Sequence, residues 1–188
     1  MPTELTPATR VAGVLLSICY ASRMKRSFSL YLGTTIFGIT DGIVSTVGLL
    51  AGITVGGASS RIIVLTGVVY AFVEAFSMAV GNFLSEESTE EYAAKADVAD
   101  GLPIAIGLLM FAAFTLASLL PLAPYLFLAP STALLVSIAV SFAALFIAGV
   151  AGARLSRLPL FWRGMRMALL GGFAILLGIA IGRLFPGA

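Results

Sequence analysis

Histidine is absent from this chain of 188 residues, and cysteine occurs only once, at Cys19. The absence of histidine excludes zinc and haem sites that use this ligand, and it excludes the Ser-His-Asp triad. A single cysteine excludes an internal disulfide and any metal site built from several cysteines. Because no nucleophile–base pair can be assembled without histidine or a buried lysine, we expect the protein not to be an enzyme.

Charge is also scarce, at 11 % of the residues against about 25 % in soluble proteins. Hydrophobic residues make up 60 % of the chain, and the mean hydropathy is +1.08. A soluble domain of this size needs more polar surface, so a soluble enzyme or a nucleic-acid-binding protein is excluded. The net charge of +2 is too small to indicate an anionic partner. The composition predicts an integral membrane protein embedded in a lipid bilayer.

Long uncharged runs predict where the chain crosses the bilayer. A hydrocarbon core of about 30 Å takes roughly 20 apolar residues in a helix. The uncharged run 101–153 has room for two spans, with Pro121, Pro124 and Pro130 marking the turn between them. The sequence therefore predicts an all-α membrane protein with five transmembrane helices within residues 28–188. The helices are expected at residues 30–55, 62–84, 102–120, 132–153 and 165–185.

Three connections and an N-terminal segment complete the predicted layout. Gly56 and Gly57 make the first turn, residues 85–101 a short acidic cytoplasmic connection, and residues 154–163 a basic loop. The segment 1–27 contains a short apolar stretch followed by basic residues, where a signal peptide would have small residues and a cleavage site. An interfacial helix is favoured there over a signal-peptide core, and a true start at Met24 is the third interpretation.

Lysine and arginine predict the orientation. With the N-terminus in the cytoplasm, nine basic residues lie on the cytoplasmic side, and only Arg61 and Arg183 lie outside. Five spans then place the C-terminus outside. The nine cytoplasmic residues are Arg10, Arg23, Lys25, Arg26, Lys95, Arg154, Arg157, Arg163 and Arg166.

Two carboxylates lie inside predicted spans, and such residues are functional candidates because a charge within the bilayer is costly. Counted along their helices at about 1.5 Å per residue, Asp41 and Glu74 both lie roughly 15–17 Å from the cytoplasmic end. Met78 follows Glu74 by four residues and therefore projects from the same helix face. The alternative for each carboxylate is a protonated group that hydrogen-bonds between helices, and for Met78 it is ordinary packing.

These three side chains form a chemically specific set of ligands. Carboxylates bind hard and borderline divalent cations, and a thioether adds a soft donor that Mg²⁺ and Ca²⁺ do not use. The combination predicts a site for a first-row transition metal such as Fe²⁺ or Mn²⁺. A further acidic group in the 85–101 connection either collects cations at the cytoplasmic mouth or forms only a solvated helix end. Its glutamates are Glu86, Glu87, Glu90 and Glu91.

Small residues predict how the helices pack. Gly48 and Gly52 have the spacing of a helix-packing motif, and Gly171, Gly178 and Gly182 form a small-residue stripe on the fifth helix. Five helices make a transport path within one chain implausible. A symmetric dimer supplies ten helices and places two copies of the Asp41 region around one axis.

Two segments resemble signatures of the vacuolar iron transporter family. Residues 37–46, which read FGITDGIVST, are similar to its first-helix pattern F-G-x-x-D-G-I/L-V-S/T-S/T. Residues 77–85 are similar to its second-helix pattern S-M-x-x-G-E-Y/F-L/I/V-S. The resemblance covers roughly residues 28–185. The resemblance implies a dimeric antiporter that moves Fe²⁺ or Mn²⁺ out of the cytoplasm in exchange for protons. It places Asp41 and Met78 at the family's Asp and Met positions. No cofactor is expected besides the transported ion.

The chain departs from the family pattern in three places. The family commonly has a helical cytoplasmic metal-binding domain between helices two and three, whereas about 17 residues lie there in this chain, as in the plant nodulin-like branch. Asn82 stands at the Glu of the second signature. The helix-two carboxylate of the family tends to lie two turns before the Met, where this chain has Tyr70, and Glu74 lies one turn before Met78.

Two other functions stay open at this point: a membrane scaffold or metal-responsive partner subunit without flux, and a cation channel without proton coupling. The expected location is the cell membrane if the source is prokaryotic and a vacuolar-type membrane if it is eukaryotic.

Overall fold

The computed structural model describes residues 7–94, 101–155 and 159–187, with side chains described within 27–92, 101–154 and 159–187. Within these ranges the fold is all-helical. Five helices are long and apolar enough to cross a membrane, which confirms the predicted fold class and number of spans. The elements are α1 (Pro7–Val55), α2 (Ser60–Ala94), α3 (Gly101–Leu122), η1 (Ala123–Leu126), α4 (Pro130–Leu155) and α5 (Leu160–Leu184).

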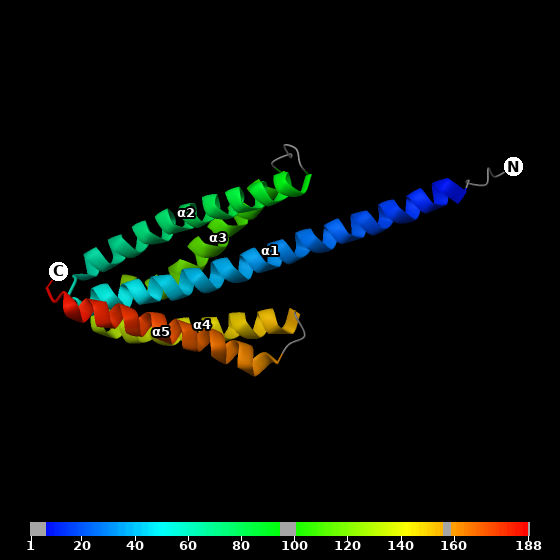
Figure 1. Cartoon of the computed structure of the whole chain (residues 1–188). Coiled ribbons are helices and arrows are strands. Elements are labelled where there is room, and N and C mark those ends of the chain that lie inside the picture. Colours follow the sequence, from blue (N-terminus) through cyan, green and yellow to red (C-terminus); the bar gives the residue numbers. More distant parts are fainter. Residues whose placement is uncertain (1–6, 95–100, 156–158, 188) are drawn as a thin grey trace.

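The helices alternate in direction along one bundle, so that α1 begins and α5 ends at opposite ends of it (Figure 1). Helix α1 is the longest and projects past the other helices at its N-terminal end (Figure 1). Its candidate span is Ser27–Val55. The apolar stretch 11–22 therefore belongs to the same unbroken helix as the first span. Its placement at the membrane surface, and the side of the membrane that each terminus faces, stay predictions.

Several helix ends differ from the expected ones. Helix α2 continues past residue 84 to Ala94, because the Glu- and Ala-containing segment that follows favours a helix although it is too polar for a bilayer. Most of the expected 85–101 connection is thus helical. Helix α5 begins at Leu160, directly after Pro159, so Arg163 lies in α5 rather than in the basic loop.

The turn between α3 and α4 also differs in detail. Pro121 lies inside the last turn of α3 rather than in the turn itself. There it is buried, and its carbonyl oxygen accepts a hydrogen bond of 2.7 Å from the Ser137 hydroxyl of α4. The turn is made by η1, which contains Pro124, and α4 begins at Pro130. Prolines therefore flank this connection as expected, and one of them also joins two helices.

Helix α1 is the centre of the bundle. It packs closely along α3 and along α5, whereas α2 packs mainly along α3 and touches α1 only sparsely. The Ser118 hydroxyl of α3 donates to the carbonyl oxygen of Gly42 on α1, at 3.3 Å. The α1–α2 turn includes Gly57 in a left-handed conformation (φ 93°), as the Gly-Gly pair predicts, and the Gly56 carbonyl accepts a hydrogen bond of 2.7 Å from the Gly187 amide.

Glycines allow α1 and α5 to meet backbone to backbone. A Cβ atom added to Gly178 would collide with the carbonyl oxygen of Gly48, and one added to Gly182 would collide with that of Gly52. In the opposite direction, a Cβ on Gly52 would lie 2.9 Å from the Gly178 carbonyl oxygen. The Gly48–Gly52 motif is confirmed as a packing motif, and its partner is the stripe on α5.

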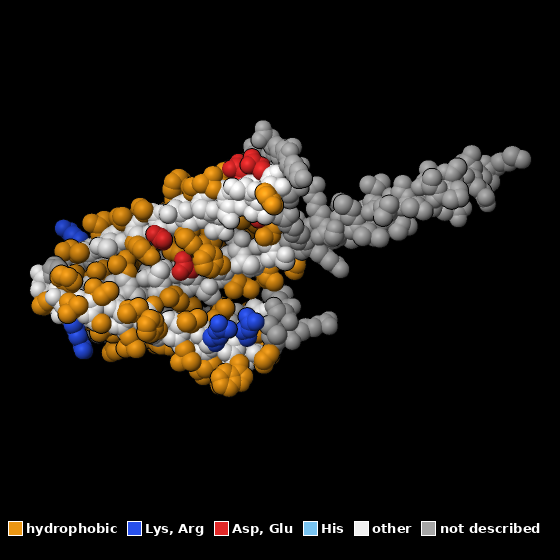
Figure 2. Space-filling view, in the orientation of Figure 1, with side chains coloured by type: hydrophobic (Ala, Val, Ile, Leu, Met, Phe, Trp, Pro, Cys, Tyr) orange, Lys and Arg blue, Asp and Glu red, His pale blue; other side chains and the backbone are white. Residues whose placement is uncertain are grey.

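The outside of the bundle is apolar. Large hydrophobic side chains are exposed on all five helices, among them Phe76, Leu108, Leu135 and Leu176. Figure 2 shows hydrophobic side chains over most of the described surface, with charges gathered mainly toward the helix ends. This distribution suits a bundle surrounded by lipid, and the protein is a multi-pass membrane protein.

Candidate metal-ion site between helices α1 and α2

The two acidic residues of the spans come together between α1 and α2. Asp41 and Glu74 are both partly buried, and their carboxyl groups lie close enough to interact electrostatically. No arginine or lysine among the described side chains pairs with either group. The structure therefore brings together the two carboxylates that residue counting put at one depth, and it leaves their charge uncompensated.

Two hydroxyl groups complete a polar patch around this pair. Tyr70 lies one turn before Glu74 on α2, and its hydroxyl lies near that of Ser45, which lies one turn after Asp41 on α1. Tyr70 also interacts electrostatically with both carboxylates. The Ser45 hydroxyl donates to the backbone carbonyl of Asp41. We call Asp41, Ser45, Tyr70 and Glu74 the polar patch.

The sequence did not single out Ser45 and Tyr70 as members of the site. The available signal was their spacing, since each lies four residues from a carboxylate on its own helix. Their proximity additionally requires that α1 and α2 meet at this level, which the pattern of a single helix does not reveal.

Met78 lies one turn beyond Glu74 and is partly buried. It packs against a cluster of buried residues formed by Ala75, Met110 and Phe114. Tyr70 packs against the same cluster, with its ring centroid 6.5 Å from that of Phe114. Met78 thus has a packing role, and its role as a metal ligand stays a prediction.

Asn82 does not replace the missing glutamate as an acidic group. Its side-chain amide donates a hydrogen bond of 2.9 Å to the backbone carbonyl of Met78. The amide is neutral, so the residue contributes no charge at this position.

The four glutamates at the end of α2 do not share one environment. Glu86 is buried, with 8 % of its surface exposed, and it interacts with another residue. Glu87 and Glu90 are partly exposed, and Glu91 is exposed. We call these four residues the acidic extension of α2. No group of three Asp, Glu or Cys side chains able to hold a metal occurs anywhere in the described part of the chain.

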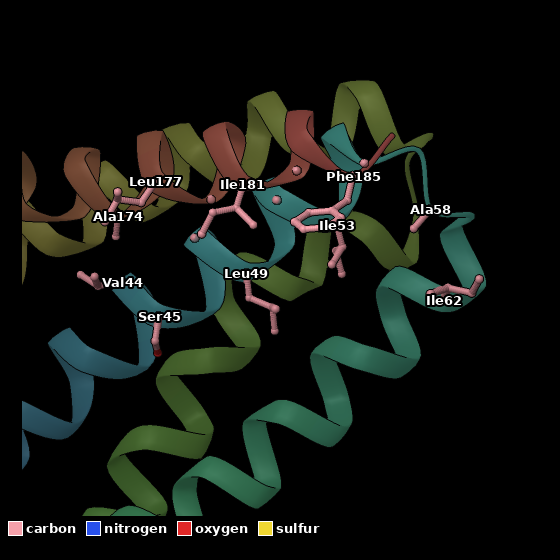
Figure 3. A pocket seen from close by; sticks show the side chains of 15 residues that line it. Val44, Ser45, Leu49, Ile53, Ala58, Ile62, Ala174, Leu177, Ile181 and Phe185 are labelled. Carbon is pink, nitrogen blue, oxygen red and sulfur yellow. The ribbon is translucent and has the colours of Figure 1, made fainter. Parts of the chain in front are cut away.

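An apolar groove leads away from the polar patch toward the α1–α2 turn. It has a volume of about 570 Å³ and lies between α1, the start of α2 and α5. Figure 3 shows Val44, Leu49 and Ile53 of α1 opposite Leu177 and Ile181 of α5, with Ser45 as the one polar side chain among those labelled. Because Ser45 also belongs to the polar patch, the groove and the patch adjoin.

The family model of the VIT family, the vacuolar iron transporters, matches residues 32–100 and 92–183. The chain belongs to the VIT family. A comparison with curated proteins found no match. Membership identifies this chain as one of a family of membrane metal-ion transporters, which agrees with the expectation that it is not an enzyme. The matched residues include the whole polar patch, Met78 and the acidic extension.

Proposed function

We propose that this VIT-family protein carries Fe²⁺ or Mn²⁺ out of the cytoplasm in exchange for protons, as a symmetric dimer. The observation that carries the proposal is the pair of carboxylates, Asp41 and Glu74, which interact within the spans without a basic partner among the described residues. Two uncompensated negative charges at this depth are costly, so the pair favours a bound divalent cation or bound protons.

The charges balance in a simple way. One divalent cation neutralises two carboxylates, and two protons do the same. Metal binding displaces protons from the carboxyl groups, and proton binding on the other side of the membrane releases the metal. If the site opens to one side at a time, an inward proton gradient drives metal efflux. The hydroxyls of Ser45 and Tyr70 adjoin the pair and offer oxygen ligands or a path for the protons.

The preference for Fe²⁺ or Mn²⁺ rests on Met78. Its thioether lies one turn from Glu74 on the same face of α2. A soft sulfur donor next to two carboxylates favours first-row transition metals over Mg²⁺ and Ca²⁺. Zn²⁺ and Cu²⁺ sites more often use histidine or cysteine, and neither is available at this depth.

The small number of ligand groups in one protomer supports a dimer. A single protomer offers two carboxylates, one thioether and two hydroxyls at the site, and no third acidic side chain joins them in the described residues. The apolar groove beside Ser45 is lined by α1, α2 and α5, and its side chains Leu177 and Ile181 are exposed. A second copy covering this face would bury the groove and bring two polar patches around one axis.

The experiment is metal flux in proteoliposomes, with Fe²⁺, Mn²⁺, Zn²⁺ and Mg²⁺ offered separately and a dye reporting the internal pH. We expect Fe²⁺ or Mn²⁺ flux that depends on an imposed pH gradient and is accompanied by opposite proton movement. Asp41→Asn should abolish uphill transport, because the amide neither binds a proton nor neutralises the metal. Glu74→Gln should weaken transport less, because it stands one turn away from the position of the family's carboxylate. Arg183→Gln, which removes an exposed charge in the last turn of α5 and touches none of the proposed ligands, is the control and should transport like the wild type.

Three results would contradict the proposal. Gradient-driven flux in Asp41→Asn at the wild-type rate would exclude the coupling mechanism. Metal flux without counter-movement of protons would favour a channel. The absence of flux for all four metals, in protein that remains folded, would favour a scaffold or partner subunit.

A further inference from the structure

A second groove lies at the opposite end of α5, at its N-terminus. It has a volume of about 590 Å³ and follows one face of the helix. It combines one tryptophan, two arginines and an apolar stretch in order along the helix. These residues are Trp162, Arg163, Arg166, Leu169, Leu170 and Phe173.

The charged end of this groove is positive and unpaired. Arg163 and Arg166 are exposed and lie three residues apart, so they project from neighbouring positions on α5. No carboxylate among the described residues pairs with either arginine. Figure 2 shows a group of basic side chains well away from the acidic group at the end of α2. The N-terminal end of the α5 dipole adds further positive potential at this point.

The rest of the groove is apolar and lies deeper along the span. Leu169, Leu170 and Phe173 are 64 %, 59 % and 62 % exposed. Phe173 follows Arg166 at the seventh position, which is about 10 Å along a helix and most of the depth of one leaflet. Trp162 is 72 % exposed beside the arginines, at the level where tryptophan occurs at membrane interfaces.

We propose that this groove binds an anionic phospholipid. Arg163 and Arg166 hold the phosphate of the headgroup, and an acyl chain lies along Leu169, Leu170 and Phe173. A headgroup with a net negative charge complements the two arginines, whereas the amine of a zwitterionic headgroup would face the same positive charges. The predicted orientation places this end in the cytoplasmic leaflet, where anionic lipids are concentrated in cells. The inference does not depend on the transport mechanism.

Trp162 is the only tryptophan in the chain, so its fluorescence reports on this groove alone. The full-length protein is reconstituted in vesicles of brominated phosphatidylglycerol with ordinary phosphatidylcholine, and in the reciprocal mixture with the bromine on phosphatidylcholine. Bromine quenches tryptophan at short range. Because each arginine near the surface adds to the attraction, we expect the quenching to correspond to an enrichment of phosphatidylglycerol of at least about fivefold at Trp162.

Variants separate a built site from general surface charge. Replacing Arg163 and Arg166 together by glutamine should abolish the enrichment, and replacing both by lysine should keep most of it. Arg154→Gln removes a charge at the end of α4 without touching the groove. The double change of Arg61 and Arg183 to glutamine removes two charges at the far end of the bundle. Both controls should keep the enrichment.

Four results would overturn the inference. The first is equal quenching by both brominated lipids in the wild-type protein. The second is an enrichment that survives the double glutamine change. The third is relief of quenching by inorganic phosphate, which lacks an acyl chain. The fourth is the absence of quenching by either lipid, which would show that protein, such as a second copy, covers the groove.

Discussion

Replacing Gly178 by alanine tests the contact between α1 and α5. A Cβ atom at this position would collide with the carbonyl oxygen of Gly48 on the facing helix. The obstruction is backbone on both sides, so no side chain can turn away to make room. The two helices must therefore separate along the stripe that also holds Gly52 against Gly182.

The expected change in the free energy of unfolding of Gly178→Ala is the sum of two opposing contributions. Overpacking of a tightly packed interior costs about 1–3 kcal/mol, and a backbone obstruction corresponds to the upper end of this range. The helix propensity of alanine offsets about 1 kcal/mol of it. A net loss of about 2 kcal/mol lowers the Tm of a chain of this size by roughly 4–8 °C.

The assay is thermal unfolding of purified protein in detergent, followed by the loss of the main size-exclusion peak after heating. The matched control is Gly81→Ala on α2, where an added Cβ meets nothing within 4 Å. The control should be as stable as the wild type or slightly more stable. Gly178→Ala with the same Tm as Gly81→Ala would refute the backbone contact between α1 and α5.

Three further predictions concern topology and transport. In a background with Cys19 replaced, a cysteine substituted for Ser60 should react with an impermeant thiol reagent on intact cells. A cysteine substituted for the exposed Tyr92 should react only after lysis. The reverse labelling pattern would show that the orientation is inverted. Met78→Leu should lower Fe²⁺ or Mn²⁺ flux while the fold survives, because such a swap costs under about 1.5 kcal/mol, and unchanged flux would leave Met78 with packing alone. Changing all four glutamates of the acidic extension to glutamine should raise the apparent KM for the metal and leave the maximal flux nearly intact. An unchanged KM would mean that these glutamates form only a solvated helix end.

The number of helices could be predicted because each predicted span is an apolar run of sufficient length with no more than two charged residues. The helix ends outside the bilayer could not be predicted in this way, since hydropathy marks the crossing and not the helix. The segment after Leu84 is too polar for a membrane, yet it continues α2 to Ala94. Pro121 shows the same limit, because a proline in the last turn of α3 looks in the sequence like part of a loop.

The candidate site could be predicted in part. Counting along two antiparallel helices put Asp41 and Glu74 at one depth, and in the structure they interact. The proximity of Ser45 to Tyr70, and the glycine stripe on α5 as the partner of Gly48, depend on which helices are neighbours. Periodicity within one helix gives the direction of a face but not what lies opposite it.

The sparse contact between α1 and α2 has a consequence for the motion of the two carboxylates. Asp41 stands on a helix fixed backbone to backbone on α5, whereas Glu74 stands on a helix held mainly by the apolar surface of α3. A shift of α2 along α3 therefore changes the distance between the two carboxyl groups without opening the glycine contact. A metal ion held by both carboxyl groups would connect α2 to the part of the protomer formed by α1 and α5. Protons bind each carboxyl group separately, so they would leave α2 free to shift along α3.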